Sequence, residues 1–347
     1  MNDIRLKFYT ILVILFFSTV LLIPTGCSTT GTGQGELVVY NARNETFVKP
    51  LLDRFEEETG IRVRILSGRE EMINQIIEER GNVRADIYIS NDAGAMEYLR
   101  RENLLSTNDS SLLKSVDERF RAPDGSWVGL SARSRILIYN RDLISEEEMP
   151  KTLWELADPA WAGQFMITRG GNSSMVTHVA ALRLVWGDEK TGEWLVALKN
   201  NAGAIVSGHT DIRHSVGAGE FKFGLVNNYY YHLQLDEAQG NNVGAVYPDQ
   251  GIDEIGVFVN VAGVALIKES PNEENARLFI DWLLEDEQQR EFSYYSKETP
   301  LNPAVQTVEE ARRIDQYKLM NIYLADLGPL WNDAKVLIEE SGLDLGI

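Results

Sequence analysis

The chain has 347 residues, 44% of them hydrophobic, and its 33 Lys and Arg against 52 Asp and Glu give a formal net charge of −19. This length and apolar content suffice for two packed domains and exclude a disordered or collagen-like chain. The negative charge repels polyanions, and no basic patch interleaved with aromatic residues reverses it, so nucleic acid is not an expected partner.

The N-terminal segment is typical of a secretory signal peptide. Arg5 and Lys7 precede an uncharged, largely apolar stretch over residues 8–23. This stretch is shorter than the roughly 18 apolar residues of a membrane-spanning helix, so an uncleaved anchor is the weaker alternative. We therefore expect residues 1–27 to form a signal peptide segment.

Cys27 is the only cysteine of the chain and ends this segment. Its position after a small residue and before a polar stretch resembles a bacterial lipoprotein processing site. Such sites usually carry Leu, Val or Ile three residues before the cysteine, whereas this chain has Pro24. We expect lipidation of Cys27, with residues 28–35 as a flexible tether to the membrane.

From Glu36 onward, short apolar runs alternate with amphipathic helical patterns, as in α/β domains with largely parallel strands. The first unit has predicted strands over residues 36–40, 61–66 and 85–89, each followed by a helix. In the first of these helices, Phe47, Leu51 and Phe55 share one face, and Gly60 is expected to end the helix in the left-handed conformation.

A second α/β unit is predicted further along the chain. Its strands are expected near residues 135–139, 164–168, 204–206 and 222–226, and its helices include 174–186 and 189–199. The apolar stretch 256–267 predicts a fully buried strand. Ser270 to Glu273 reads as a capping box with proline at the first helical position, and the chain from there to Ile347 is predicted to be helical.

Two α/β units predict a bilobal molecule with a ligand cleft at the carboxyl ends of its strands. We expect lobe 1 to comprise residues 36–132 and 256–306, lobe 2 residues 133–255, and C-terminal helices over 307–347 to pack on the lobes. Composition alone does not separate a binding protein from a secreted enzyme.

Several segments, in their order and spacing, resemble one known family. They are Val39 to Glu45, Phe55 to Ile61, Ala85 to Ile87, Gly129 to Asn140, Leu156 to Gly163, Gly224 to Tyr230, and Thr299 to Pro303. From about Leu37 to the C-terminus, the chain resembles the iron(III)-binding lipoproteins of ABC transporters, the ferric-binding protein family. The resemblance implies the type II periplasmic-binding-protein fold, with two α/β lobes joined by hinge strands near residues 131–136 and 250–258.

The resemblance also implies a function. It predicts a monomeric, extracytoplasmic receptor, lipid-anchored to the cell membrane on the periplasmic or outer face, that delivers ferric iron or a ferric chelate to an ABC permease and its ATPase. It does not predict an enzyme.

In that family, the tyrosines that match Tyr229 and Tyr230 bind ferric iron as phenolates, and the tyrosine that matches Tyr139 commonly joins them. Ferric ion favours anionic oxygen donors, and a tyrosine that titrates near pH 10 loses its proton near neutrality only beside a strongly charged cation. The alternative is a strand, in which adjacent side chains point to opposite faces and one ring would be core and the other surface. Tyr139 could equally be an ordinary strand-end residue.

The first lobe departs from the family pattern. Many members have His at the position of Asn44 and Glu at the position of Asn91, and others have Tyr at the position of Glu45. Asn44 is more simply a helix N-cap, and Asp92 is either an oxygen donor or a cap. We therefore expect Asn44, Asn91 and Asp92 to line the cleft. The second-lobe tyrosines would bind iron together with water, an anion or Glu45, unless the ligand is a different one.

Arg133 and Arg135 precede Tyr139 on the strand expected to cross between the lobes. In the family, an arginine of this segment can hold a carbonate-like synergistic anion beside the iron, which suits the planar guanidinium. The alternative is a structural ion pair. Thr210, with His209, is expected to open a helix that presents amide donors to an anion.

Enzyme motifs are absent from the sequence. It has no Gly-x-Ser-x-Gly elbow, no His-Glu-x-x-His, no phosphate-binding glycine-rich loop and no cysteine available as a nucleophile. Two alternatives stay open: the same fold binding a small organic or anionic solute, and a secreted hydrolase that uses Asp92 or Glu45 as an acid or base.

Overall fold

The computed structural model describes residues 35–68, 71–307 and 311–343. Within these ranges no helix is long and apolar enough to cross a membrane. The predicted signal peptide, the lipidation site Cys27 and all but the last residue of the predicted tether lie outside the described residues.

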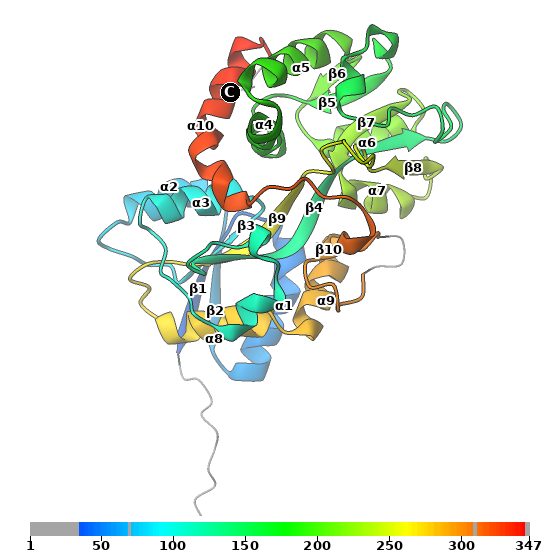
Figure 1. Cartoon of the computed structure of the whole chain (residues 1–347). Coiled ribbons are helices and arrows are strands. Elements are labelled where there is room, and N and C mark those ends of the chain that lie inside the picture. Colours follow the sequence, from blue (N-terminus) through cyan, green and yellow to red (C-terminus); the bar gives the residue numbers. More distant parts are fainter. Residues whose placement is uncertain (1–34, 69–70, 308–310, 344–347) are drawn as a thin grey trace, which may run out of the picture. The chain divides into compact units, whose positions relative to one another are not determined.

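One mixed sheet organises the described chain, with the strand order β2-β1-β3-β9-β4-β7-β5-β6, and with β8 and β10 pairing with β4 (Figure 1). The strands are β1 (Glu36–Asn41), β2 (Arg62–Ser67), β3 (Ile87–Ser90), β4 (Trp127–Asn140), β5 (Phe165–Thr168), β6 (Ala204–Val206), β7 (Phe223–Asn227), β8 (Val243–Val246), β9 (Val259–Leu266) and β10 (Thr299–Pro300). The pairs among β1, β2 and β3 and among β5, β6 and β7 are parallel. Every strand pair that includes β4 or β9 is antiparallel, so the prediction of largely parallel strands holds only away from the centre of the sheet.

Strand β4 connects the two halves of this sheet. Its residues up to Ser134 pair with β9, and its residues from Arg135 pair with β7. All 14 residues of β4 are buried, and its apolar residues lie on both sides of a buried polar stretch that contains Arg133 and Arg135. We call β1, β2, β3 and β9 with their covering helices lobe 1, and β5 to β8 with theirs lobe 2. Figure 1 shows β4 running from lobe 1 into lobe 2, with β9 beside its first half.

Helices cover the sheet in both lobes. The α-helices are α1 (Glu45–Thr59), α2 (Glu71–Glu78), α3 (Ala93–Arg101), α8 (Glu273–Leu283) and α9 (Asp286–Ser296) in lobe 1, α4 (Ser173–Trp186), α5 (Asp188–Asn201), α6 (His209–Gly217) and α7 (Asn228–Leu235) in lobe 2, and α10 (Trp331–Glu340) near the C-terminus. Short 3-10 helices are η1 (Ser111–Ser115), η2 (Glu118–Phe120), η3 (Trp154–Ala157), η4 (Pro159–Trp161), η5 (Ile314–Gln316) and η6 (Leu324–Leu330).

Helix α1 shows how the sequence sets the ends of an element. The Asn44 side chain accepts a hydrogen bond from the Thr46 amide (3.2 Å), and Gly60 ends the helix at φ 72°. Both features were predicted, because asparagine caps the first free amides and glycine alone adopts the left-handed conformation at little cost. The face with Leu51 and Phe55 is buried in the core.

The capping box predicted over residues 270–273 is wrong. Helix α8 begins at Glu273, and Asn272, which precedes it, makes no side-chain capping bond. The Ser270 hydroxyl instead donates to Oδ1 of Asp86 (2.7 Å), which also accepts the Asn272 amide (2.9 Å). The Asp86 carboxylate, just before β3, therefore binds the Ser270 hydroxyl and the Asn272 amide, and neither bond belongs to a capping box.

The prediction that the chain is helical after residue 273 is wrong for its middle part. After β10, the described chain up to residue 323 contains only one short 3-10 helix, η5. The buried side chains of this segment include Leu301, Ile314 and Met320. Leu319 forms an isolated bridge with Val257.

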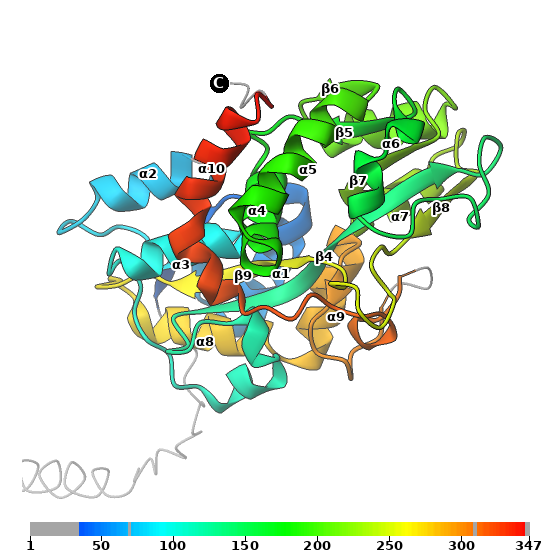
Figure 2. The same ribbon diagram turned by 45° about the horizontal axis from the view of Figure 1, so that its top comes forward.

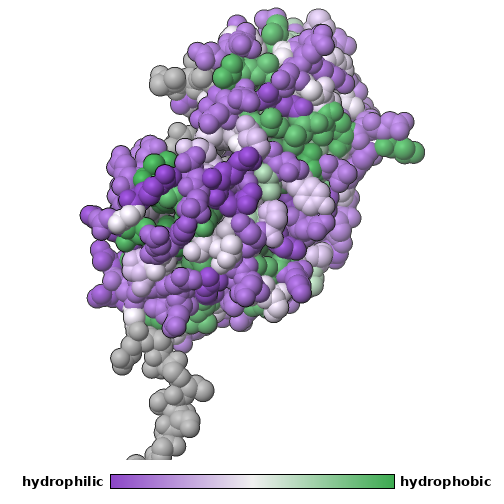
Figure 3. Space-filling model, turned by 60° about the vertical axis from the view of Figure 1, so that its left-hand side comes forward, coloured by the Kyte–Doolittle hydropathy of each residue, from purple (hydrophilic) through white to green (hydrophobic). Residues whose placement is uncertain are grey.

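The C-terminal helix contacts both lobes. Its preceding turn, η6, packs on α3 of lobe 1, and α10 packs on α4 and α5 of lobe 2. Leu327 of η6 and Ala334 and Ile338 of α10 are fully buried in these contacts. Figure 2 shows α10 next to α3 and α4. On the face shown in Figure 3, hydrophilic side chains cover most of the surface, as expected for a chain of high negative charge.

Candidate functional site

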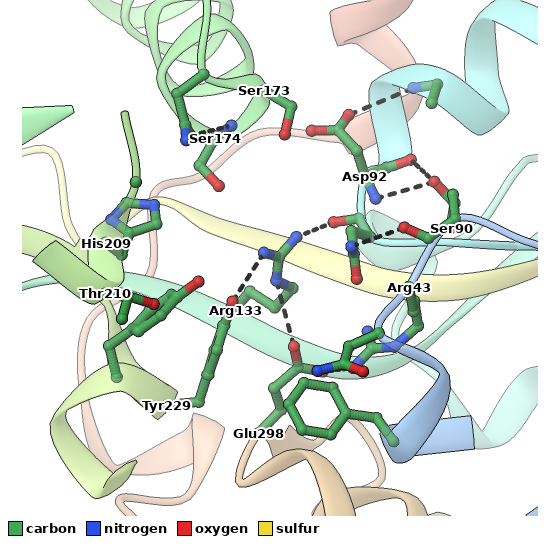
Figure 4. A pocket seen from close by; sticks show the side chains of 18 of the residues that line it. Arg43, Ser90, Asp92, Arg133, Ser173, Ser174, His209, Thr210, Tyr229 and Glu298 are labelled. Carbon is green, nitrogen blue, oxygen red and sulfur yellow. Dashed lines mark hydrogen bonds and ion pairs between the residues drawn. The ribbon is translucent and has the colours of Figure 1, made fainter. Parts of the chain in front are cut away.

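A cavity of about 860 Å³ lies between the lobes. Most of its lining residues lie in β3 or in segments that directly follow β1, β3, β5, β6 and β7. The others are Glu71 and Ile73 of α2, Arg133 of β4, Glu298 and Trp331. The cavity therefore opens at the carboxyl ends of the parallel strands, where α/β sheets bind ligands. Figure 4 shows part of its lining.

Tyr229 and Tyr230 both line the cavity. They lie in the first turn of α7 and not in a strand, so the alternation expected for neighbouring strand residues does not apply. Their ring centroids are 4.2 Å apart, with the rings tilted by 33°. Tyr229 is 7% exposed. The structure thus brings two phenols to one point of the pocket wall.

Two asparagines fix the start of α7. Oδ1 of Asn228 accepts the amide of Ser134 (3.0 Å), and its Nδ2 donates to the hydroxyl of Thr299 (3.4 Å). Nδ2 of Asn227 donates to the hydroxyl of Ser174 at the start of α4 (3.2 Å). The tyrosines are therefore positioned by bonds to β4, β10 and α4.

Arg133 lies between Tyr229 and a buried carboxylate (Figure 4). Its Nη2 donates to the Tyr229 hydroxyl (3.4 Å), its Nη1 donates to the carbonyl of Asn91, and its Nε lies 3.3 Å from Oε1 of Glu298. Burial opposes the charge of Arg133, but Tyr229 and Glu298 favour it and hold the pKa of the guanidinium above its ordinary value. The pocket therefore keeps a permanent cation beside the phenols.

Arg43 and Glu298 are site residues that sequence reasoning missed. Nη2 of Arg43 lies 3.0 Å from Oε2 of Glu298, and the hydroxyl of Ser131 donates to the same carboxylate oxygen. Arg43 is 4% exposed and Glu298 is 1% exposed. Their positions in the sequence could have pointed to them. Arg43 lies inside the first segment that resembles the ferric-binding family, and Glu298 directly precedes the last one. One carboxylate thus holds two guanidiniums at the pocket.

Arg135 lies beneath the pocket and does not line it. It is 1% exposed, and its Nη1 lies 3.2 Å from Nε2 of His209 and donates to Oδ1 of Asn227 (3.3 Å). Its Nε and Nη2 have no hydrogen-bond partner within the described part of the chain. Burial, and then the charge of Arg133, lower the pKa of Arg135 to about 9. His209 does line the pocket, with its ring 4.9 Å from that of Tyr230.

Tyr230 is held in its neutral form. Burial, and then the neighbouring Tyr229, raise its pKa far above the ordinary value, while Arg133 acts in the opposite direction. A phenol in this position keeps its proton at neutral pH unless a cation arrives to replace it.

The structure does not bring Tyr139 to the pocket. It lies six residues beyond Arg133 on β4, about 20 Å further along the strand, where it pairs with Phe223 and Gly244. Its ring packs over Gly244, and its hydroxyl lies 3.5 Å from Oε2 of Glu146. The prediction of Tyr139 as a ligand is therefore corrected, because the strand carries it away from the other tyrosines.

Glu45 is also outside the lining of the cavity. Its Oε2 accepts a hydrogen bond from the hydroxyl of Ser67 at the end of β2 (2.8 Å). The start of α1 thus places Asn44 at the pocket and directs the Glu45 side chain to the end of β2. We do not retain Glu45 as a candidate ligand.

The remaining predicted residues do line the cavity, namely Asn44, Asn91, Asp92 and Thr210. Asn91 donates through Nδ2 to the carbonyl of Ala42 (3.1 Å). Asp92 caps α3, and burial raises the pKa of its carboxyl group, although hydrogen bonds from other side chains act in the opposite direction. Thr210 is exposed in the first turn of α6.

Within the described ranges, no group of three or more His, Cys, Asp or Glu side chains is placed to hold a metal ion. The pocket does bring two phenol groups together, those of Tyr229 and Tyr230. Phenolate oxygen suits a hard, highly charged cation better than a soft one.

Comparison with known proteins gives consistent matches. The family described as "Bacterial extracellular solute-binding protein" matches residues 51–320. Iron uptake protein A1 of Synechocystis sp. is 30% identical over 89% of this chain and 88% of its own length. The Fe(3+)-binding periplasmic protein of Serratia marcescens is 28% identical over 80% of this chain and 82% of its own.

Among solved structures, iron-bound HitA from Pseudomonas aeruginosa superposes with a TM-score of 0.82 at 28% identity, covering 89% of this chain and all of the other. Such neighbours are bilobal periplasmic binding proteins, so the predicted fold class is confirmed. The matched family and relatives are solute-binding proteins and not enzymes, which rules out the hydrolase alternative.

Proposed function

The chain belongs to the bacterial extracellular solute-binding protein family, and on that premise we propose that it is the receptor of an ABC importer that binds ferric iron. The relatives named for iron uptake and Fe(3+) binding support this choice of solute. The receptor would deliver its solute to a permease and the attached ATPase.

The observation that carries the proposal is the pair Tyr229 and Tyr230 at the wall of the interlobe cavity. Ferric ion replaces the phenolic protons and binds both oxygens as phenolates. Arg133 beside Tyr229 favours the negative charge that the phenolates acquire. We assign the two tyrosines as the protein's metal ligands.

The other coordination positions fall to water or to a small anion such as carbonate. Arg133 and the exposed Thr210 line the same cavity and offer donors to such an anion. Arg135 contributes positive charge from beneath the pocket, since it does not reach the lining. A ferric chelate that brings its own anionic ligand fits the same arrangement, because the cavity of about 860 Å³ is far larger than one ion.

The two lobes would close around the solute by hinge motion. We propose hinges near residues 131–136 and 250–258, lobe 1 over residues 36–132 and 256–306, and lobe 2 over residues 133–255, with residues 307–347 packing on both. The change of pairing partner on β4 between Ser134 and Arg135 supports the first of these hinges.

We also propose that the protein is held at the membrane by its N-terminal segment. Lipidation of Cys27, which stays on the chain when the signal segment before it is cleaved, would anchor a monomer to the outer face of the membrane through the tether 28–35. A receptor held there captures solute outside the cytoplasm and stays close to its permease.

Visible absorption tests the ferric proposal. Ferric citrate is titrated into the chain from Ser28 onward, which contains the whole compact unit Gly33–Ile347. Iron(III) bound to phenolate gives a charge-transfer band that neither partner has alone. We expect a band that saturates at about one iron per chain and is lost in the double variant Tyr229→Phe, Tyr230→Phe.

Tyr139→Phe is the matched control, because it removes a phenol that lies outside the cavity. The band should persist in this variant. A colourless wild-type protein, or a band that the double variant retains, would refute the ferric assignment.

A small organic or anionic solute is the second candidate. Lobe 1 offers the pocket no histidine, and the two guanidiniums of Arg43 and Arg133 share one carboxylate there. A wide pocket in which two guanidiniums share one carboxylate suits an organic anion. A thermal-shift screen of small anions, polyols and amines would identify it if the absorption titration fails.

A further inference from the structure

Asp92 uses both of its carboxylate oxygens within the protein. Oδ1 accepts the amides of Gly94 (2.7 Å) and Ala95 (3.3 Å) and so caps α3. Oδ2 accepts hydrogen bonds from Oγ1 of Thr177 (2.6 Å) and Nδ2 of Asn260 (2.9 Å). Asp92 is 5% exposed. Since four donors already surround it, this carboxylate has a role other than that of a free ligand in the pocket.

The bond to Thr177 crosses between the lobes. Asp92 precedes α3 of lobe 1, whereas Thr177 lies in α4 of lobe 2 and is fully buried. Figure 4 shows Asp92 on the side of the pocket that faces Ser173 at the start of α4. Hydrogen bonds to a charged acceptor are stronger than neutral ones, so this contact is a substantial link between the two pocket walls.

A second contact joins the lobes at the same place. Trp331, the first residue of α10, lies against Gly94, where an added Cβ would come within 2.9 Å of the indole Cδ1. Helix α10 packs on α4 and α5 of lobe 2. Arg183 of α4 donates to the carbonyl of Leu330 (3.4 Å). The start of α3 therefore touches lobe 2 through Thr177 and the bridging helix through Trp331.

We propose that Asp92, Thr177 and Trp331 form an interlobe brace that holds the pocket walls in register and favours the closed arrangement before any ligand binds. The inference rests on the proposed function only in that the interlobe cavity is the ligand site. A ligand that binds the closed form gains apparent affinity in proportion to the closed fraction. The three residues act as positioning residues and need not touch the ligand.

Thr177→Val tests the brace, because it removes the hydroxyl and keeps the shape of the side chain. Thr177→Ser is the matched control that keeps the hydroxyl. In the chain from Ser28 onward, Glu78→Cys on α2 and Glu193→Cys on α5 place spin labels at exposed positions of the two lobes. Without ligand, we expect Thr177→Val to shift the distances between the labels to longer values and Thr177→Ser to match the parent.

Ferric citrate binding supplies the second readout. The apparent Kd should rise about tenfold in Thr177→Val, the value expected for one lost hydrogen bond to a charged group, and stay near the parent value in Thr177→Ser. Trp331→Ala removes the other contact of the brace and should also lengthen the distances between the spin labels. It tests the brace independently if Thr177→Val fails to fold.

Unchanged label distances in both Thr177→Val and Trp331→Ala would overturn the brace, whatever the ligand is. An equal effect of Thr177→Ser and Thr177→Val would overturn it too, since the hydroxyl would not be the cause. Longer distances combined with no ferric binding, even by the parent, would support the brace and contradict the ferric proposal.

Discussion

At the scale of single residues, the pocket depends on one buried carboxylate that compensates two buried guanidiniums. Glu298 accepts from Arg43 and lies within ion-pair distance of Arg133, and the guanidinium of Arg133 reaches Tyr229. A buried cation without a counter-charge is costly. Glu298 therefore supports both the stability of the fold and the position of the charge beside the phenols.

Replacing Glu298 by Gln should destabilise the protein by about 3–5 kcal/mol, because two buried guanidiniums lose their only carboxylate partner among the described residues. The free energy of unfolding from urea denaturation measures this. Glu102→Gln, which breaks the exposed ion pair with Arg80, is the control and should change it little. Equal losses in the two variants would show that Glu298 contributes no more than a surface charge.

How far the site could be predicted differs among residues. The pair Tyr229 and Tyr230 followed from the resemblance to ferric-binding proteins, and the structure places both at the cavity. The partnership of Arg43 and Glu298 joins residues 255 positions apart, which no local pattern encodes. Tyr139 shares its strand with Arg133, but a strand advances about 3.3 Å per residue and carries it out of reach.

At the scale of elements, the end of a helix could be predicted from the sequence where a single residue determines it. Gly60 ends α1 at φ 72° as predicted, because only local backbone geometry is involved. The predicted capping box of Ser270 is wrong, and the Ser270 hydroxyl instead donates to Asp86, which is distant in sequence. The turn from β7 into α7 also depends on distant partners, since Asn228 bonds to Ser134 and Thr299.

Gly60→Ala should destabilise the protein by about 1–2 kcal/mol, because alanine in the left-handed conformation brings its Cβ too close to the backbone carbonyl. Outside the adjacent backbone, an added Cβ meets no atom within 4 Å at this position, so the cost comes from the local backbone alone. Chemical denaturation measures the loss.

Gly192→Ala is the matched control, since it is the same substitution inside α5, where the nearest atom to an added Cβ is Cδ1 of Leu337 at 3.4 Å. This change should stabilise the protein by about 0.5–1 kcal/mol through helix propensity. If both substitutions shifted stability in the same direction, the backbone explanation for Gly60 would be wrong.

At the scale of the whole molecule, the proposed binding of ferric iron by phenolates would link ligand capture in the interlobe pocket to proton release. Burial raises the pKa of Tyr230, so this phenol is protonated throughout the physiological range and loses its proton only when a cation binds. Each proton displaced makes the affinity fall as pH falls, by about tenfold per pH unit. Acidification would therefore aid release of the solute.

Proton release can be counted by calorimetric titration with ferric citrate in two buffers of different ionisation enthalpy. We expect wild-type protein to release about one proton more per bound iron than Tyr230→Phe, because the variant has one phenol fewer to deprotonate. The difference between the proteins cancels the protons that citrate takes up. Tyr139→Phe should release as many protons as wild type, since that phenol lies outside the cavity. Equal counts for wild type and Tyr230→Phe would mean that Tyr230 binds its ligand as a neutral phenol, which suits an organic solute and not a ferric ion.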